Sequence, residues 1–231
     1  MPDPAAELRT LVAEFYEVWF RFHPAAALAL GEPVSGTLLP PLDDDERGAL
    51  ASWLETLILA LDELDLGALD PVCSQDVALL AGAVWIEHRE LIDLDWRRRD
   101  PLGCLPLEGL HALILQPGRD LRPRLAGLLA AIPDHLRDAQ ALLSERAPGL
   151  ARPLVQAAVR EADCGRRYLD ALARGSWLRQ HCHGLPEIQS LIDAAGAALA
   201  DSRELLRTEI APRARGPVAC GRCHLAERLS A

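Results

Sequence analysis

The sequence predicts an all-α protein, a bundle of seven or eight helices of which some are kinked by proline. Three observations lead to this fold class. Apolar residues recur at steps of three and four over most of the 231 residues, which is the spacing of an amphipathic helix. Proline, glycine and aspartate fall between those stretches, where helices begin and end. The alternation with period two that marks a half-buried strand is not evident. We expect a single domain over residues 1–231, long enough to bury a core without disulfides or metal.

The first two predicted helices cover residues 5–22 and 25–30. Pro24 separates them, because proline disfavours helical geometry in the residue before it. Gly31 is a natural end for the second helix, since glycine accepts the left-handed conformation that closes many helices. The proline-rich residues 32–42 are therefore expected to form a loop.

Two longer helices are expected at about residues 43–66 and 74–98. Asp43, Asp44 and Asp45 offer an N-cap and an acidic first turn, which suits the positive end of a helix dipole. Ser74 is the expected cap of the second of these helices.

The remaining helices are expected at 107–115, 120–146, 151–173, 186–212 and from about 218 onward. Pro133 lies in the middle of the stretch 120–146. Because proline has no backbone N–H to donate, we expect the helix to kink or split near Ile132.

Several short motifs occur along the chain in the order typical of one known family. These are His23-Pro24-Ala25 leading to Leu30-Gly31, Asp100-Pro101-Leu102, the leucine-rich stretch 107–115, Arg124-Leu125, Ile132-Pro133, Leu136, Leu142-Leu143 and residues 216–229. In this order they resemble the N-terminal half of the bacterial domain of unknown function 885 (DUF 885) family. The resemblance covers nearly the whole chain and implies a helical frame.

The same resemblance has an implication for activity. Members of the family are more than twice this length and are zincin-like peptidase relatives, with a His-Glu-x-x-His helix in the C-terminal half. That motif supplies two zinc ligands and a glutamate that activates water. None of the seven histidines of this chain stands in such a motif, so no peptidase residue can be carried over. The resemblance implies a truncated, non-catalytic relative that acts as a binding or interaction protein, or else one half of a split metallopeptidase.

The residues most typical of a chemical site lie near the C-terminus. Cys220-Gly221-Arg222-Cys223-His224 matches the C-x-x-C-H pattern of covalent c-type haem attachment. Together with His181-Cys182-His183 it offers three cysteines and three histidines, enough for a tetrahedral zinc site. The predicted helix 186–212 would hold the two clusters roughly 40 Å apart unless it breaks near Gly196 or a neighbouring segment brings them together. The alternative function is therefore metal or haem binding, with zinc as the first cofactor to consider and c-type haem as the second.

Blander interpretations of these residues stay open. The C-x-x-C pair could form a redox-active disulfide, or the cysteines could simply pack a terminal helix while His224 faces solvent. His111 and His135 lie on amphipathic segments, where single histidines are usually partly buried and hydrogen-bonded.

Charge and composition limit the partners. A net charge of −10, from 34 acidic and 24 basic residues, argues against nucleic-acid binding, which needs a basic face. No stretch reads as a secretory signal or is apolar for long enough to span a membrane. We therefore expect a cytoplasmic protein with reduced cysteines. Apolar surface left uncovered by the absent half predicts a homodimer or a protein partner.

Overall fold

The computed structural model describes residues 3–34, 37–118, 120–182, 186–219 and 221–230. These residues form ten α-helices and no β-strand, so the all-α prediction is confirmed. None of the described helices combines the length and the hydrophobicity needed to cross a lipid bilayer.

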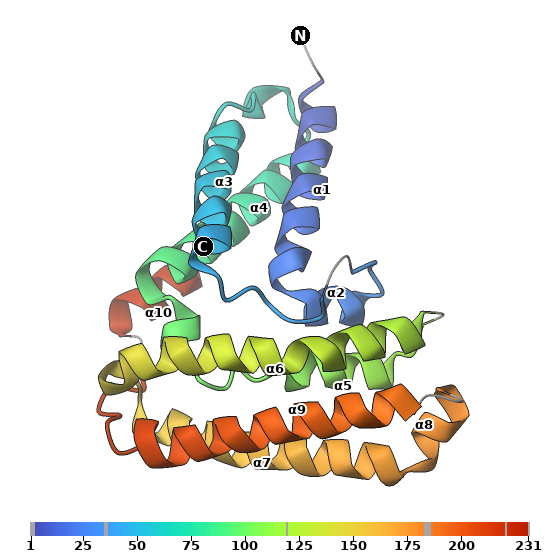
Figure 1. Cartoon of the computed structure of the whole chain (residues 1–231). Coiled ribbons are helices and arrows are strands. Elements are labelled where there is room, and N and C mark those ends of the chain that lie inside the picture. Colours follow the sequence, from blue (N-terminus) through green and yellow to red (C-terminus); the bar gives the residue numbers. More distant parts are fainter. Residues whose placement is uncertain (1–2, 35–36, 119, 183–185, 220, 231) are drawn as a thin grey trace. The chain divides into compact units, whose positions relative to one another are not determined.

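The chain groups into two compact units (Figure 1). Unit 1 comprises Met1–Phe22, Asp43–Trp96 and Ala219–Ala231, and unit 2 comprises His23–Leu42 and Arg97–Val218. Each unit has a hydrophobic core of its own. The expectation of a single domain stays a prediction.

Unit 1 contains α1 (Pro4–Phe22), α3 (Asp44–Asp62), α4 (Pro71–Arg89) and α10 (Arg222–Ser230). Its core is built from the buried faces of the first three, with Phe15, Leu54 and Val84 among its members. The ring of Phe15 stacks on that of Trp53, with ring centroids 6.5 Å apart. These contacts join α1 to α3 on the side that the apolar periodicity marks.

Aspartates cap two of the unit 1 helices. The Glu46 backbone N–H donates to Asp43 at the start of α3, as the acidic first turn predicted. The start of α4 differs from the prediction: Asp70 caps it, accepting from the Cys73 backbone N–H at 2.8 Å. Ser74 is therefore not the cap. Pro71 occupies the first helical position, where a missing N–H costs nothing.

The helix expected over 74–98 also ends sooner. After α4 the chain forms a π-helical segment, Glu90–Leu94, and then turns at Asp95, which has a left-handed φ of 41°. A short 3₁₀ turn, Trp96–Arg98, follows.

Unit 2 contains α2 (Pro24–Leu30), α5 (Leu107–Leu115), α6 (Leu121–Arg146), α7 (Arg152–Arg174), α8 (Ser176–His181) and α9 (Pro186–Leu205). The long helices α6, α7 and α9 pack together around fully buried leucines, isoleucines and alanines. α6 continues through Pro133 instead of dividing there. A π-helical segment, Leu206–Ile210, prolongs α9. The short helix α8 was not predicted.

The proline-rich loop is held to α5 by a close backbone approach in unit 2. A side chain at Gly109 would collide with the carbonyl oxygen of Leu38. Because Gly109 has none, α5 lies directly against the loop, with Leu38, Leu110 and Leu113 all buried. This contact fixes α5, which forms one wall of the pocket described next.

Candidate functional site

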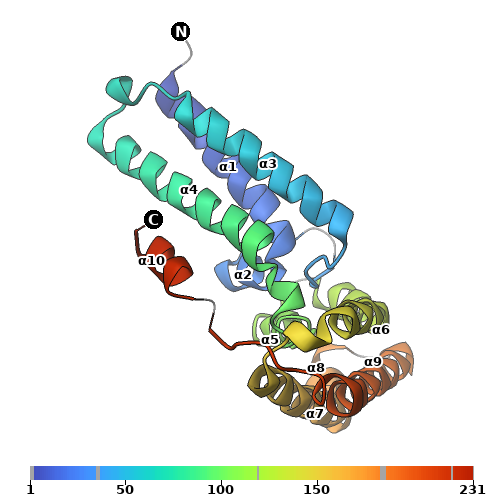
Figure 2. The same cartoon turned by 90° about the vertical axis from the view of Figure 1, so that its left-hand side faces the viewer.

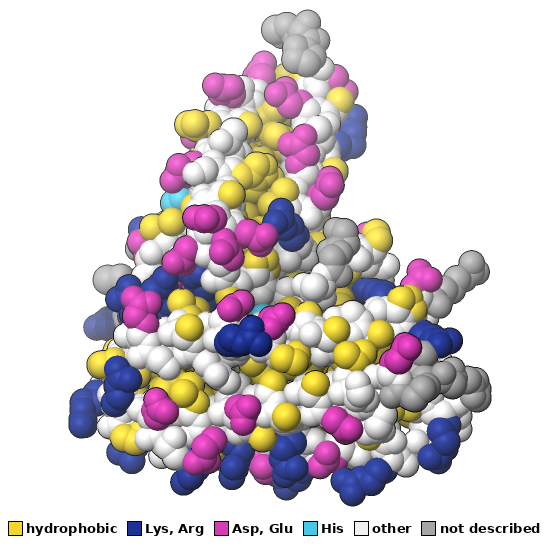
Figure 3. Space-filling view, viewed as in Figure 1, with side chains coloured by type: hydrophobic (Ala, Val, Ile, Leu, Met, Phe, Trp, Pro, Cys, Tyr) yellow, Lys and Arg dark blue, Asp and Glu magenta, His cyan; other side chains and the backbone are white. Residues whose placement is uncertain are grey.

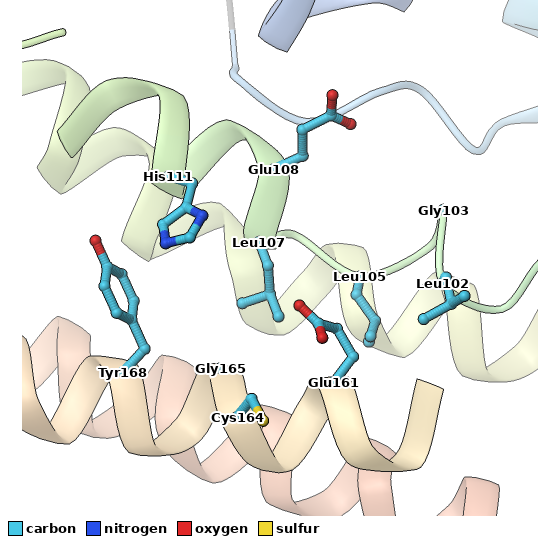
Figure 4. Close-up of a pocket in the computed structure, with 10 residues that line it drawn as sticks. All are labelled: Leu102, Gly103, Leu105, Leu107, Glu108, His111, Glu161, Cys164, Gly165 and Tyr168. Atoms are coloured by element: carbon cyan, nitrogen blue, oxygen red, sulfur yellow. The ribbon is translucent and has the colours of Figure 1, made fainter. Parts of the chain in front are cut away.

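A pocket of about 480 Å³ opens within unit 2, between α5 with its preceding turn and α7 (Figure 4). It is lined by Leu102, Gly103, Leu105, Leu107, Glu108, His111, Glu161, Cys164, Gly165 and Tyr168. Its size falls within the range of small-molecule sites. We take it as the candidate functional site.

The floor of the pocket depends on the absence of a side chain at Gly165. A Cβ placed there would lie 2.5 Å from Cδ2 of Leu107. Gly165 is buried in the middle of α7, where glycine costs about 1 kcal/mol relative to alanine. The cost is offset by the close approach of Leu107, which gives the pocket an apolar base together with Leu105.

His111 and Tyr168 meet at one end of the pocket. Their rings stand edge to face, with centroids 5.0 Å apart and planes at 87°. Burial raises the pKa of the Tyr168 phenol above its ordinary value. The phenol therefore stays neutral at physiological pH and can donate or accept a hydrogen bond.

Two carboxylates belong to the lining, but they are oriented differently. In Figure 4 the Glu161 side chain rises from α7 into the pocket, toward Leu105 and Leu107, whereas Glu108 points away from it. Among the residues that the structure describes, Glu161 has no ion-pair or hydrogen-bond partner, and no arginine lines the pocket. Glu161 is exposed and therefore offers a carboxylate without a partner among the described residues, next to apolar surface.

Cys164 supplies a thiol at the base of the pocket. It is exposed, and its sulfur accepts from Nη2 of Arg167 at 3.7 Å. Arg167 is also paired with Asp163 at 2.9 Å. Within the described part of the chain no hydrogen bond joins Cys164 to His111. The pocket presents groups suited to binding.

The first half of the sequence-predicted metal cluster lies at the end of α8 in unit 2. His181 is exposed, donates from Nδ1 to the backbone oxygen of Trp177 at 2.9 Å, and stacks on the Trp177 ring. Cys182 is buried, which raises the pKa of its thiol. His183 lies outside the described residues.

The second half of that cluster belongs to unit 1. Cys220 lies outside the described residues, and Cys223 falls within α10 with its side chain undescribed. Nε2 of His224 is buried and has no hydrogen-bond partner in the described part of the chain, so the interpretation in which His224 faces solvent is wrong for this atom. No three His, Cys, Asp or Glu side chains of the described residues come together as metal ligands. The six-residue metal site stays a prediction.

The pocket is not among the sites that the sequence predicts. His111 and His135 are both expected to be partly buried and hydrogen-bonded, and this is right only for His135. The His135 ring is buried and donates from Nε2 to the Cys104 carbonyl oxygen at 3.1 Å. The residues that α7 contributes to the pocket do share one helix face, which the sequence spacing of three, one and three indicates. They are Glu161, Cys164, Gly165 and Tyr168.

Comparisons with known proteins identify a protein of similar structure. No protein-family model matches this sequence, and no curated protein is similar to it. The chain is similar in structure to a protein of unknown function from Shewanella oneidensis, described as "a putative lipoprotein", with a TM-score of 0.71 and 16% sequence identity. The match covers 92% of this chain but only 38% of that protein. At this identity the likeness shows a shared helical fold.

Proposed function

We propose that this chain is a non-catalytic helical binding protein, and that the pocket between α5 and α7 is its binding site. The observation that carries the proposal is the combination of an apolar floor with two separate polar ends. Glu161 provides a carboxylate without a partner among the described residues, and Tyr168 provides a neutral phenol beside His111. The ligand that fits is a small amine with an apolar body.

Each part of such a ligand has a physical counterpart in the pocket. An ammonium group next to Glu161 forms a charge-assisted hydrogen bond, which is stronger than one between neutral groups. Apolar atoms over Leu105 and Leu107 gain about 25 cal/mol for each Å² removed from water. A carboxylate ligand would face the charge of Glu161 instead and is expected to be excluded.

The proposal is tested with 2-phenylethylamine and 3-phenylpropionate, which share an apolar body but differ in charge. Ligand-observed NMR should detect the amine and not the acid. Glu161→Gln should weaken amine binding by about tenfold or more, since a hydrogen bond to a charged group contributes about 1.5–3 kcal/mol. Glu187→Gln, which changes an exposed carboxylate of α9, is the matched control and should bind like the unmodified chain.

Two results would contradict the proposal. One is equal binding of the amine and the acid; the other is full retention of amine binding in Glu161→Gln. Either would mean that the pocket does not select a cation.

The relationship to the DUF 885 family also enters the proposal. It rests on the order of the short motifs along the chain, which resembles that of the family's N-terminal half. On this proposal the purified chain should not cleave a fluorogenic peptide library. Cleavage that appears only after adding a separately produced His-Glu-x-x-His protein would favour a split metallopeptidase, and cleavage by the chain alone would overturn a non-catalytic role. A cytoplasmic location is a further part of the proposal, which cell fractionation tests.

Metal binding at the C-terminal cluster is a second candidate function. It is favoured by Nε2 of His224, a ring nitrogen that is buried without a hydrogen-bond partner among the described residues. Zinc would use Cys220, Cys223 and His224 of unit 1 as ligands. Elemental analysis of the purified protein should then find bound zinc that Cys220→Ala/Cys223→Ala removes. An equal zinc content in both proteins would contradict this candidate function. An absorption spectrum of covalently attached haem would identify haem, and not zinc, as the cofactor.

A further inference from the structure

The two units differ sharply in charge. Unit 1 carries 19 acidic and 6 basic side chains, a net charge of −13, whereas unit 2 carries 15 acidic and 18 basic side chains, a net charge of +3. Figure 3 shows acidic side chains over α1 and α3 and arginines gathered along α7. The whole negative excess of the chain therefore belongs to unit 1, and a surface of that unit favours a cationic partner.

Within unit 1, α4 has an apolar row of which two members, Val72 and Leu79, are not covered by its neighbours. Val77, Leu80 and Val84 are buried toward α1 and α3. On another side of the helix Val72 and Leu79 are 66% and 70% exposed. A lone exposed apolar residue is ordinary, but a row along one helix marks an interaction surface.

The spacing of this row is that of a helix that pairs with another helix. Val72, Leu79 and Ile86 are seven residues apart, and Gln75 and Gly82 stand at the intermediate positions. Val72 and Leu79, with the half-buried Ile86 one heptad further, match one of the two apolar positions of a helix-pairing seam, whereas Gln75 and Gly82 are not large apolar residues. We define the α4 seam as these five residues.

Carboxylates flank the seam, and one of them already binds a helix. Asp76 stands four residues after Val72 and three before Leu79, and Glu90 stands four after Ile86, so both lie on the same side as the row. Arg228 of α10 pairs with Glu90 at 2.8 Å, and α10 lies beside this end of α4 in Figures 1 and 2. An arginine of α10 therefore pairs with a carboxylate just beyond the C-terminal end of α4, and Val72 and Leu79 stay exposed.

We propose that the α4 seam binds a basic amphipathic helix of a protein partner, whose apolar face covers Val72 and Leu79 and whose cations approach Asp76. A second copy of this chain is the poorer occupant, because pairing two α4 seams would bring together two units that each carry −13. The surface lies in unit 1 and is independent of the pocket in unit 2.

The probe for this proposal is a fluorescently labelled synthetic peptide of about three heptads, with leucine at the two seam positions and lysine and alanine elsewhere. Fluorescence anisotropy with the full chain should report binding that weakens as salt screens the charges. A peptide of the same composition in scrambled order should bind much more weakly, and so should one with glutamate in place of lysine.

Two double variants test whether the peptide binds at the α4 seam. Val72→Glu/Leu79→Glu should weaken peptide binding by about tenfold or more, the size of effect expected at the centre of an interface. The matched control is Leu30→Glu/Leu115→Glu, which places the same charges at two leucines of unit 2 that are 69% and 76% exposed. Circular dichroism confirms that both double variants remain helical, since all four positions are exposed.

Three outcomes would overturn the proposal. The first is equal peptide binding by the two double variants, and the second is equal binding of the ordered and scrambled peptides. The third is a dimer of the unmodified chain that Val72→Glu/Leu79→Glu dissociates, which would assign the seam to a second copy.

Discussion

Leu107 of α5 rests on the bare backbone of Gly165 in α7, so closely that a Cβ at Gly165 would lie 2.5 Å from one methyl carbon of Leu107 and 2.7 Å from the other. The obstructing atoms are the ends of a flexible side chain, so an alanine at this position would displace Leu107 without moving the backbone. That displacement would push Leu107 into the pocket that the glycine keeps open.

Gly165→Ala should therefore destabilise the protein by about 1–3 kcal/mol, because overpacking outweighs the better helix propensity of alanine. Adding Leu107→Ala should recover part of the loss, giving a coupling energy of at least about 0.5 kcal/mol. Urea unfolding of the two single variants and the double variant measures this coupling. Additive effects would mean that Leu107 and Gly165 do not constrain each other.

Gly216 is predicted to tolerate no side chain at all. A Cβ there would collide with the carbonyl oxygen of Gly149, and the Gly216 backbone N–H donates to the Leu150 oxygen at 2.8 Å. Since the atoms that a Cβ would meet belong to the backbone of Gly149 and Leu150, Gly216→Ala should cost about 3 kcal/mol, at the upper end of overpacking effects.

The matched comparison for that variant is Gly196→Ala in α9. Nothing lies within 4 Å of a Cβ at Gly196, so alanine should stabilise the helix by about 0.5–1 kcal/mol. Thermal unfolding should move the melting temperature in opposite directions for the two variants. A shift in the same direction would contradict the backbone contact assigned to Gly216.

His135 should make the stability of the protein depend on pH. Burial lowers the pKa of its imidazole below the ordinary value of 6.5, even though the hydrogen bond to the Cys104 oxygen favours the charged form. The folded state therefore binds fewer protons than the unfolded state as pH falls below about 6.5. The stabilising contribution is complete above that pH and is lost progressively down to the lowered pKa.

In the unmodified protein the free energy of unfolding should decrease as the pH is lowered from 7.5 to below 6.5. In His135→Gln this decrease should be smaller. The measurement is the urea midpoint of both proteins at each pH. His111→Gln is the control, because it removes an exposed histidine by the same substitution. A slope that survives in His135→Gln would assign the acid sensitivity to other groups.

The described cysteines should react at very different rates. Cys164 is exposed in the pocket, whereas Cys182 is buried and has a raised thiol pKa, which lowers its thiolate fraction. In a Cys220→Ala/Cys223→Ala background, mass spectrometry should find iodoacetamide on Cys164 well before Cys182. Faster labelling of Cys182 would show that α8 opens readily, and a pocket ligand should slow labelling of Cys164 alone.

Much of the helical fold could be predicted because its signals are local. The cap at Asp43 and the break at Pro24 depend on residues within one turn of each other, and the structure contains both. The start of α4 was misplaced by a few residues because Asp70 and Ser74 are both plausible caps, and Pro71 favours the earlier one. Pro133 does not end α6, since the packing of α6 against α9 stabilises the helix beyond what propensity alone predicts.

The sequence by itself determined that the chain is helical, where most of its helices lie, and that it carries a large negative charge. Only the tertiary structure decided that Leu107 meets Gly165 across 58 positions of sequence, that Glu161 faces the resulting pocket, and that one apolar side of α4 stays uncovered. The physical reason is that apolar periodicity shows which side of a helix carries its apolar residues. Which faces become buried depends on contacts between segments distant in sequence, and those contacts are made only when the helices pack.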